Sequence, residues 1–122
     1  MQKLLYILPL LLFIFSCSPV DDDLLIGEWQ AAALYEEGKS IEVDLNEISL
    51  SFSNNNYHYT STLNYRESGS YFVDERFLFT IDTTHRASTE KAVEIQLLSV
   101  DSLYLRMQEN GKERLLQLAK KK

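Results

Sequence analysis

Few residues of this chain have side chains that could perform covalent or metal chemistry. Cys17 is the only cysteine, and His58 and His85 are the only histidines. Neither histidine has a second histidine or a cysteine at the spacing of a zinc site, and Asp82-Thr83-Thr84-His85 is typical of a polar loop. The chain also lacks a G-x-S-x-G nucleophile elbow, and its four glycines form no phosphate-binding loop. We therefore expect no enzymatic activity, no metal and no cofactor.

Cys17 stands at the end of an apolar N-terminal segment. Lys3 precedes twelve residues, 4–15, that carry no charge, and the small residue Ser16 follows them. This order is the pattern of a secretory signal. A helix needs about 20 apolar residues to span a bilayer, so this segment, which Pro9 interrupts, is too short. The uncharged stretch reaches Val20 only by including polar residues, which leaves an uncleaved membrane anchor as the alternative.

The sequence Ile14-Phe15-Ser16-Cys17 resembles the lipobox of bacterial lipoproteins. The resemblance implies that the Cys17 thiol is diacylated, for example with palmitate, and that cleavage makes Cys17 the first residue before its amino group is acylated. One acyl chain binds a membrane only marginally, but each buried methylene adds about 0.8 kcal/mol, so two or three chains hold stably. The alternative is an unmodified cysteine in a hydrophobic signal.

The residues that follow Cys17 bear on where the anchor resides. Ser18 stands where many bacteria place the aspartate that retains lipoproteins in the inner membrane, so the resemblance favours the outer membrane. Asp21-Asp22-Asp23 resembles the acidic tether of surface-exported lipoproteins in the Bacteroidota. The alternative is a solvated, extended spacer, since like charges repel. We expect a lipid-anchored domain that faces either the periplasm or the cell surface.

The chain divides into three segments on these signals: a lipoprotein signal peptide (residues 1–16), the acylated cysteine with its acidic tether (17–24), and one folded domain (25–122). A content of 45% hydrophobic and 25% charged residues is typical of a globular domain. Twelve basic against eighteen acidic residues give a net charge of −6, which would repel a phosphate backbone. Nucleic acid is therefore excluded as an expected partner, and we expect a monomer.

The sequence of the domain predicts β-strands, because its apolar residues alternate with polar ones and turn residues recur every eight to twelve positions. We expect eight strands and no helix longer than two turns. Asn54-Asn55-Asn56, Asp74-Glu75-Arg76 and Asn110-Gly111 are the predicted tight turns. The expected strands contain 27–35, 48–52, 57–63, 71–73, Phe77 with Phe79 and Ile81, Val93 with Ile95 and Leu97, 103–107, and 115–118.

Gly27-Glu28-Trp29 at the start of the first strand resembles the G-x-W signature of lipocalins and of the lipocalin-like lipoproteins of the Bacteroidota. Further matches are Phe52 and Tyr57 around the first hairpin, Gly69-Ser70-Tyr71, and the segment 98–105. The resemblance implies a small all-β fold, an eight-stranded antiparallel up-and-down barrel. It also implies that Trp29 plugs the closed end of that barrel.

Small and aromatic residues would then line the barrel interior. If Gly27 and Trp29 point inward, strict alternation also turns Ala31, Ala33 and Tyr35 inward, and the alanines leave room for a ligand. Tyr57, Tyr59 and Tyr71 could present hydroxyl groups to that ligand. The alternative is that the tyrosines complete a filled core. The sequence thus indicates a binding protein for a small apolar ligand, or else a protein-interaction or inhibitor module with a filled barrel.

Overall fold

The computed structural model describes residues 20–85 and 89–122. Their structure is almost entirely β-sheet, and no helix among these residues has the length and apolar character needed to cross a bilayer. Two single-turn 3₁₀ helices, η2 (Asp22–Leu25) and η3 (Leu45–Glu47), accompany the strands. The strands are β1 (Gly27–Glu36), β2 (Lys39–Ser40), β3 (Ser49–Ser53), β4 (Asn56–Thr60), β5 (Arg66–Asp74), β6 (Phe77–Asp82), β7 (Thr89–Leu98), β8 (Ser102–Glu109) and β9 (Lys112–Lys120).

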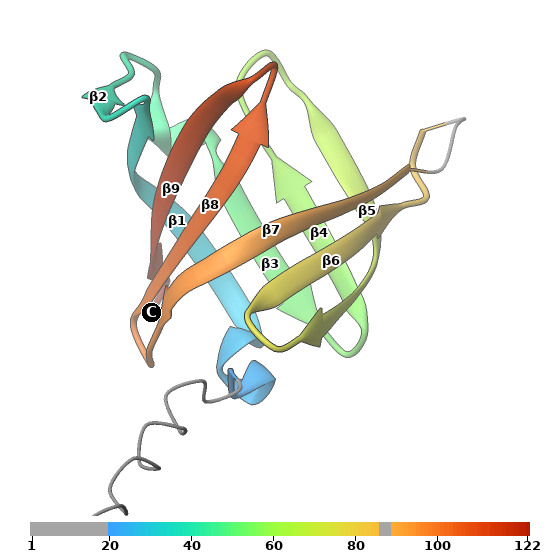
Figure 1. The fold of residues 1–122 in the computed structure, drawn as a ribbon. Coiled ribbons are helices and arrows are strands. Elements are labelled where there is room, and N and C mark those ends of the chain that lie inside the picture. Colours follow the sequence, from blue (N-terminus) through green and yellow to red (C-terminus); the bar gives the residue numbers. More distant parts are fainter. Residues whose placement is uncertain (1–19, 86–88) are drawn as a thin grey trace, which may run out of the picture.

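The sheet closes on itself as an antiparallel barrel (Figure 1). From β3 to β9 each strand pairs with its neighbour in sequence, and β1 pairs with both β3 and β9. The closing register places Trp29 opposite Lys120 and Tyr35 opposite Leu115. Eight strands therefore form the ring, as the sequence predicts, while the two-residue strand β2 pairs only with the end of β1. Closure pairs the edges that an open sheet would leave exposed.

The predicted tight turns lie where the asparagine and acidic residues indicate. Asn110 and Gly111 have φ values of 53° and 78°, so both central residues of the β8–β9 turn are left-handed. This conformation matches the twist of a two-residue hairpin. Asn55 and Glu75 are left-handed in the turns before β4 and β6.

The predicted continuation of the strand 57–63 as far as Leu63 is wrong. β4 ends at Thr60, and Leu63 lies in the following loop with 94% of its surface exposed. The amide of Ser61 donates to the carbonyl of Tyr65 at 3.0 Å, which closes the loop on itself. Leu63 and Asn64 both have φ near 59°, and two consecutive left-handed residues reverse the chain instead of extending it.

Two β-bulges change which residues face the barrel interior. In β1 the register shifts between Ala31 and Ala33, so Leu34 lies opposite the buried Leu116. The expectation that Ala33 and Tyr35 point inward is therefore wrong, because one extra residue reverses the alternation beyond it.

β7 carries a similar irregularity between Ile95 and Leu97. Ile95 is buried as expected, but Leu97 is exposed and Leu98 packs against the core in its place. The Arg76 side chain holds this bulge, since its guanidinium donates to the carbonyls of Ile95 and Gln96 at 2.7 and 3.1 Å. β6 is confirmed as a strand, and its alternation turns Leu78 into the core.

The lower end of the barrel in Figure 1 is closed by η2 and Trp29. Leu25 and Trp29 are fully buried, and the Trp29 indole Nε1 donates to the Leu25 carbonyl at 2.9 Å. The Lys120 Nζ lies 4.7 Å from the centroid of the indole ring, a cation–π distance. Gly27 has φ +130°, and a Cβ there would lie 2.5 Å from the Lys120 side chain. The positive φ of Gly27, which other residues rarely adopt, thus accounts for the glycine of the G-x-W signature.

Truncating Trp29 should remove the plug of the closed end. We expect Trp29→Ala to lower the free energy of unfolding by about 3–5 kcal/mol, the usual loss for a core aromatic. Urea titration followed by circular dichroism measures this loss, and Leu63→Ala is the exposed control with an expected change within about 0.5 kcal/mol. Emission of the intact protein should be blue-shifted and poorly quenched by iodide. Equal stability of the two variants would contradict this role of Trp29.

Candidate functional site: the barrel cavity

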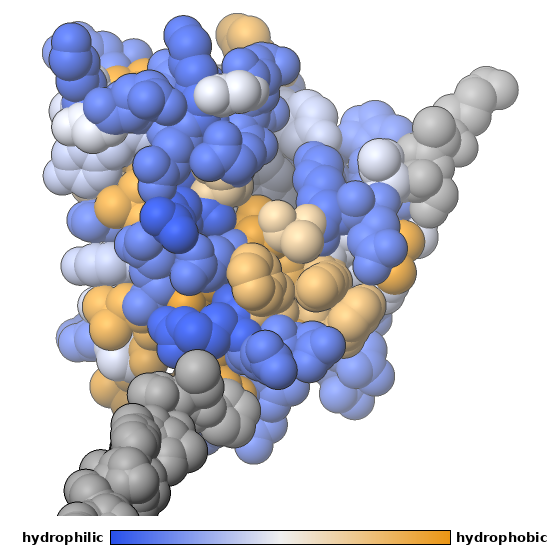
Figure 2. All heavy atoms as spheres, viewed as in Figure 1, coloured by the Kyte–Doolittle hydropathy of each residue, from blue (hydrophilic) through white to orange (hydrophobic). Residues whose placement is uncertain are grey.

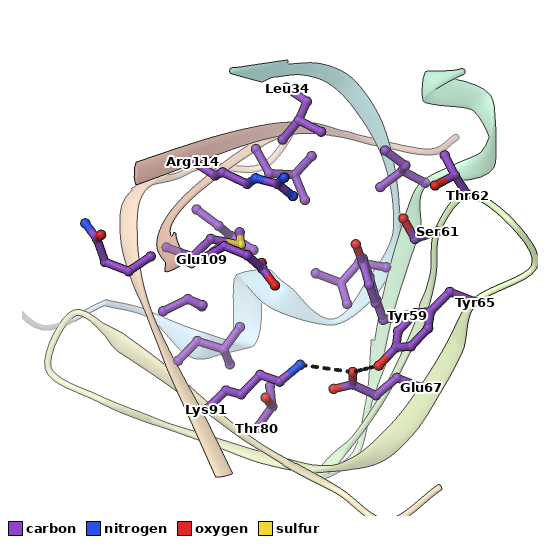
Figure 3. Close-up of a pocket in the computed structure, with 18 of the residues that line it drawn as sticks. Leu34, Tyr59, Ser61, Thr62, Tyr65, Glu67, Thr80, Lys91, Glu109 and Arg114 are labelled. Atoms are coloured by element: carbon purple, nitrogen blue, oxygen red, sulfur yellow. Dashed lines mark hydrogen bonds and ion pairs between the residues drawn. The ribbon is translucent and has the colours of Figure 1, made fainter. Parts of the chain in front are cut away.

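A cavity of about 900 Å³ occupies the upper part of the barrel (Figure 3). Its rim is formed by the β8–β9 turn, the β4–β5 loop and the segment between β2 and η3. Trp29 and η2 therefore close the end opposite the mouth. The lining residues are Leu34, Ile41, Val43, Ile48, Leu50, Tyr57, Tyr59, Ser61, Thr62, Tyr65, Glu67, Leu78, Thr80, Lys91, Ala92, Val93, Leu105, Met107, Gln108, Glu109, Asn110, Arg114 and Leu116.

Most of the cavity wall is aliphatic. Leu34 from β1 and Leu116 from β9 face each other across the closing register. Leu105 and Met107 continue this wall along β8, and Leu50 continues it on β3. Such a wall favours an apolar molecule, because burial of its surface is worth roughly 25 cal/mol per Å².

One corner of the cavity is polar and centres on the Glu67 carboxylate. Glu67 lies on β5 with only 4% of its surface exposed. Tyr57 Oη donates to Glu67 Oε2 at 2.5 Å, and Tyr65 Oη donates to Oε1 at 2.7 Å. Lys91 Nζ approaches Oε1 to 3.3 Å from β7, so these groups converge from different strands (Figure 3).

The partners of Glu67 keep its carboxylate ionised. Burial by itself would raise the pKa of Glu67, but the hydrogen bonds from Tyr57 and Tyr65 and the charge of Lys91 outweigh burial and lower the pKa. The pKa of the Tyr57 phenol is raised, first by burial and then by its hydrogen bond to Glu67. The pKa of Tyr65 is raised mainly by the same carboxylate. Both phenols therefore remain protonated and donate to Glu67 at neutral pH.

The hydrogen bonds within this corner limit which donors and acceptors it can offer a ligand. The Tyr57 and Tyr65 hydroxyl protons point at Glu67, so the oxygen of Tyr65, a residue that is 38% exposed, remains as an acceptor. The Lys91 ammonium has three protons and remains a donor while it pairs with Glu67. Because the charges of Lys91 and Glu67 cancel, the corner offers an acceptor and a donor without net charge.

A second hydrogen-bonded group supports Tyr65 from the end of β6. The buried Asp82 carboxylate pairs with the His85 ring at 2.5 Å and accepts from the Thr84 amide at 2.8 Å. Burial alone would raise the pKa of Asp82, but the bonds to His85 and Thr84 outweigh it and lower the pKa. The His85 ring stacks on the Tyr65 ring with centroids 5.6 Å apart. His85 thus holds the phenol that donates to Glu67.

The structure brings together only part of the predicted ligand site. Tyr57 and Tyr59 line the cavity. Ala31 is buried in the core but does not line the cavity, and Tyr71 packs edge-on against Phe52 with ring centroids 4.9 Å apart. Ala33 lies on the other side of the sheet, together with Tyr35, because of the bulge in β1.

Sequence reasoning missed Glu67, Tyr65 and Lys91. The inward and outward alternation of strand residues could have indicated Glu67 and Lys91. Glu67 is four residues before Tyr71, and Lys91 is two residues before Val93, so each shares the inward face of its strand. Tyr65 precedes β5 in a loop and has no such signal.

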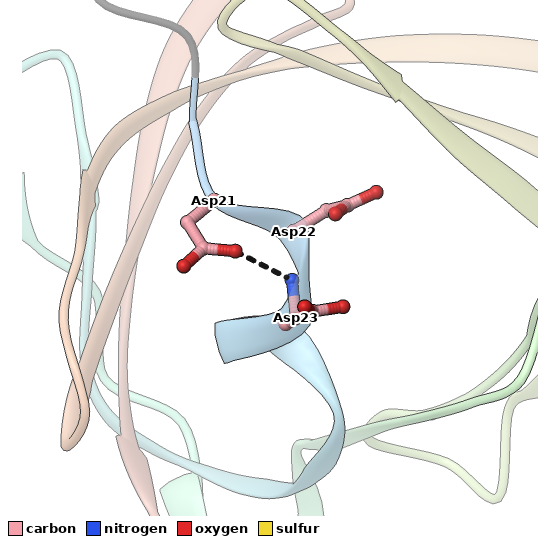
Figure 4. A group of neighbouring side chains, drawn as sticks. All are labelled: Asp21, Asp22 and Asp23. Carbon is pink, nitrogen blue, oxygen red and sulfur yellow. Dashed lines mark hydrogen bonds between the residues drawn. The ribbon is translucent and has the colours of Figure 1, made fainter.

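The three aspartates before β1 form an exposed acidic cluster (Figure 4). Their carboxylates are exposed, and Asp21 Oδ1 accepts from the Asp23 amide at 3.2 Å to cap η2. The expected extended spacer is therefore a helical turn at this point, and Val20 already packs against the core. Cys17 and the signal segment lie outside the described residues.

Two solved structures from Bacteroides species share this fold. A lipocalin-like protein from Bacteroides uniformis ATCC 8492 matches with a TM-score of 0.63 and 16% identity, over 80% of this chain and 99% of that chain. An uncharacterized protein from Bacteroides eggerthii DSM 20697 matches with a TM-score of 0.59 and 12% identity, over the same shares. No protein-family model and no curated protein matches this chain. The chain therefore has a lipocalin-like barrel fold, which confirms the predicted fold class.

Removing the Glu67 charge should destabilise the protein in a pH-dependent manner. Because its folded pKa lies below its unfolded pKa, Glu67 stabilises the fold above the unfolded pKa and loses this effect as pH falls through the folded pKa. We expect Glu67→Gln to lower the free energy of unfolding at pH 7 by about 1–3 kcal/mol.

Urea titrations between pH 7 and pH 3 test this expectation, and the difference between Glu67→Gln and the parent protein should shrink as the pH falls. Glu90→Gln, at an exposed position of β7, is the matched control and should follow the parent at every pH. A difference that stays constant across this range would show that the carboxylate charge is not what matters.

Proposed function

We propose that this protein is a lipid-anchored binding protein for a small, uncharged and mainly apolar molecule. The observation that carries the proposal is the cavity of about 900 Å³ inside the barrel. Ligand pockets in proteins typically measure about 300–1,000 Å³ and combine apolar walls with a few polar groups. A filled barrel, as an interaction or inhibitor module would have, fits this interior poorly.

The polar corner supports the choice of an uncharged ligand. A ligand hydroxyl can accept from Lys91 and donate to the Tyr65 oxygen at the same time. A ligand carboxylate would lie beside the Glu67 carboxylate, and a ligand ammonium would lie beside the Lys91 ammonium. Either charge would be partly desolvated next to a like charge, which is unfavourable. The proposed function is binding, and it assigns a catalytic role to none of these residues.

The anchoring part of the proposal comes from the N-terminal sequence. The lipobox-like Ile14-Phe15-Ser16-Cys17 would place acyl chains on Cys17 after cleavage. Two or three chains would hold the barrel at a membrane surface, and Ser18 favours the outer membrane. The barrel then faces the periplasm or the cell surface as a monomer whose cavity is accessible to small molecules, with no role for nucleic acid.

Blocking the cavity should abolish ligand binding. We expect Met107→Trp, which adds bulk at the lining of β8, to weaken binding of the uncharged probe N-phenyl-1-naphthylamine at least about tenfold, or ~1.4 kcal/mol. Val100→Trp, at an exposed turn position, is the matched control and should bind as the parent does. Fluorescence titration of a soluble form that starts at residue 18 provides the measurement.

Competition with three ligands of equal chain length then tests the head-group preference. Dodecanol should displace the probe about tenfold better than dodecanoate or dodecylamine, because only the alcohol avoids a like-charge contact. Equal probe binding by both tryptophan variants would contradict the cavity as the site. A preference for dodecanoate would contradict the uncharged ligand.

Replacing the cysteine should release the protein from the membrane. We expect Cys17→Ala to incorporate no fatty-acid label and to leave the membrane pellet, because the thiol is the proposed point of acylation. Metabolic labelling with an alkyne fatty acid and fractionation of cells provide the two measurements. Ser18→Ala, one residue away, should label normally. A Cys17→Ala protein that still carries label would overturn the anchoring proposal.

A further inference from the structure

Exposed apolar side chains gather on the outer face of the barrel near its closed end. Phe72 on β5 and Phe77 on β6 are 48% and 43% exposed. Phe79 lies between them, stacked on Phe72 with centroids 4.9 Å apart and edge-on to Phe77 at 6.4 Å. We call these three residues the aromatic patch. Figure 2 shows hydrophobic side chains gathered in this region, over β6 and β7.

The same end of the barrel exposes further apolar residues. Ile26 precedes β1, while Leu97 and Val100 lie at the β7–β8 turn, and all three are exposed. This turn adjoins the end of the chain, since the Lys120 amide donates to the Asp101 carbonyl at 3.0 Å. Apolar surface that gathers in this way marks a contact site, whereas single exposed residues do not.

The described part of the chain begins beside the aromatic patch, at Val20. The Val20 amide donates to the Glu75 carbonyl at 3.5 Å, and Glu75 lies in the turn between Phe72 and Phe77. Cys17 is three residues before Val20, and three extended residues reach at most about 11 Å. An acyl group on Cys17 would therefore hold Val20 within about 11 Å of that residue and keep the adjoining β5–β6 turn close to the lipid.

We propose that the aromatic patch docks on the lipid bilayer that holds the acyl chains, an inference that rests on the proposed acylation of Cys17. Aromatic side chains next to an anchor gain by lying at the boundary between head groups and acyl chains, about 5–10 Å deep. The surrounding charge indicates what kind of lipid is contacted. Asp21, Asp22, Asp23, Asp74 and Glu75 flank the patch, so an anionic surface would repel it and the contact is apolar.

This orientation has a consequence for the ligand. The mouth of the cavity lies at the end opposite η2, so a patch seated on the bilayer points the mouth toward water. The ligand would then enter from the aqueous phase and not directly from the membrane.

A fluorophore at the patch tests the docking in the full acylated chain. Because acylation consumes the thiol of Cys17, Phe77→Cys provides the one free thiol for an NBD label. Leu63→Cys, in the loop at the opposite end, is the matched control. In phosphatidylcholine vesicles with a nitroxide near the head group, we expect quenching at position 77 to be at least about threefold stronger than at position 63. Anionic lipid should not increase it.

Three outcomes decide against the proposal. Equal quenching at both positions, in protein that floats with the vesicles, overturns the docking and leaves acylation intact. Protein that does not float overturns the acylation together with the docking. In the third outcome, the label at position 77 is shielded from water but is not quenched by the lipid nitroxide, and the unlabelled Phe77→Cys protein forms cross-linked dimers. That result assigns the patch to contact with a second copy of the chain instead.

Discussion

The pairing of β1 with β9 is the contact on which the rest of the structure depends. Without it, the strands would form an open sheet with two unpaired edges and an apolar face in water. β1 is ten residues long, and its two edges pair with different strands: residues 27–30 pair with β3, and residues 29–36 pair with β9. The bulge after Ala31 falls within the part that pairs with β9, where an extra residue bends the strand. The ring of eight strands is then wide enough for a small interior space.

The interior differs between its two ends because side chains of different size fill it. Trp29, Leu25 and Phe52 occupy the closed end, and η2 covers them. Toward the mouth, the inward positions carry aliphatic residues and the buried Glu67. Replacing a buried ion pair by well-packed apolar residues is often neutral or stabilising. Glu67 is buried, while Lys91 keeps 55% of its side chain exposed. The proposed recognition of a polar ligand group would account for placing this pair in an otherwise apolar cavity.

The strands and most turns could be predicted from the sequence because alternation and left-handed residues are local signals. Which residues face inward beyond each bulge could not be predicted from the sequence. The run Ala31-Ala32-Ala33-Leu34 is apolar throughout, so it contains no mark of the extra residue, and the same holds for Leu97 and Leu98. The site was partly missed for a related reason. A glutamate at an inward position looks like a solvent-facing one until its partner, Lys91, is known, and that partner is 24 positions away on another strand.

The two ends of the barrel differ in structure, and the described part of the chain begins at the closed end. Because Val20 and η2 pack directly on the closed end, no long spacer separates the first described residues from the barrel. A long linker would let an anchored protein present all faces to the membrane equally. The proposed anchor at Cys17 is only three residues before Val20, so it would restrict the barrel to orientations with the closed end nearest to the membrane. Trp29 and Leu25 separate the cavity from the end of the barrel at which the described chain begins. The proposed anchor on Cys17 would therefore lie on the opposite side of this hydrophobic plug from the cavity, and lipid at that side would have no direct path to the ligand.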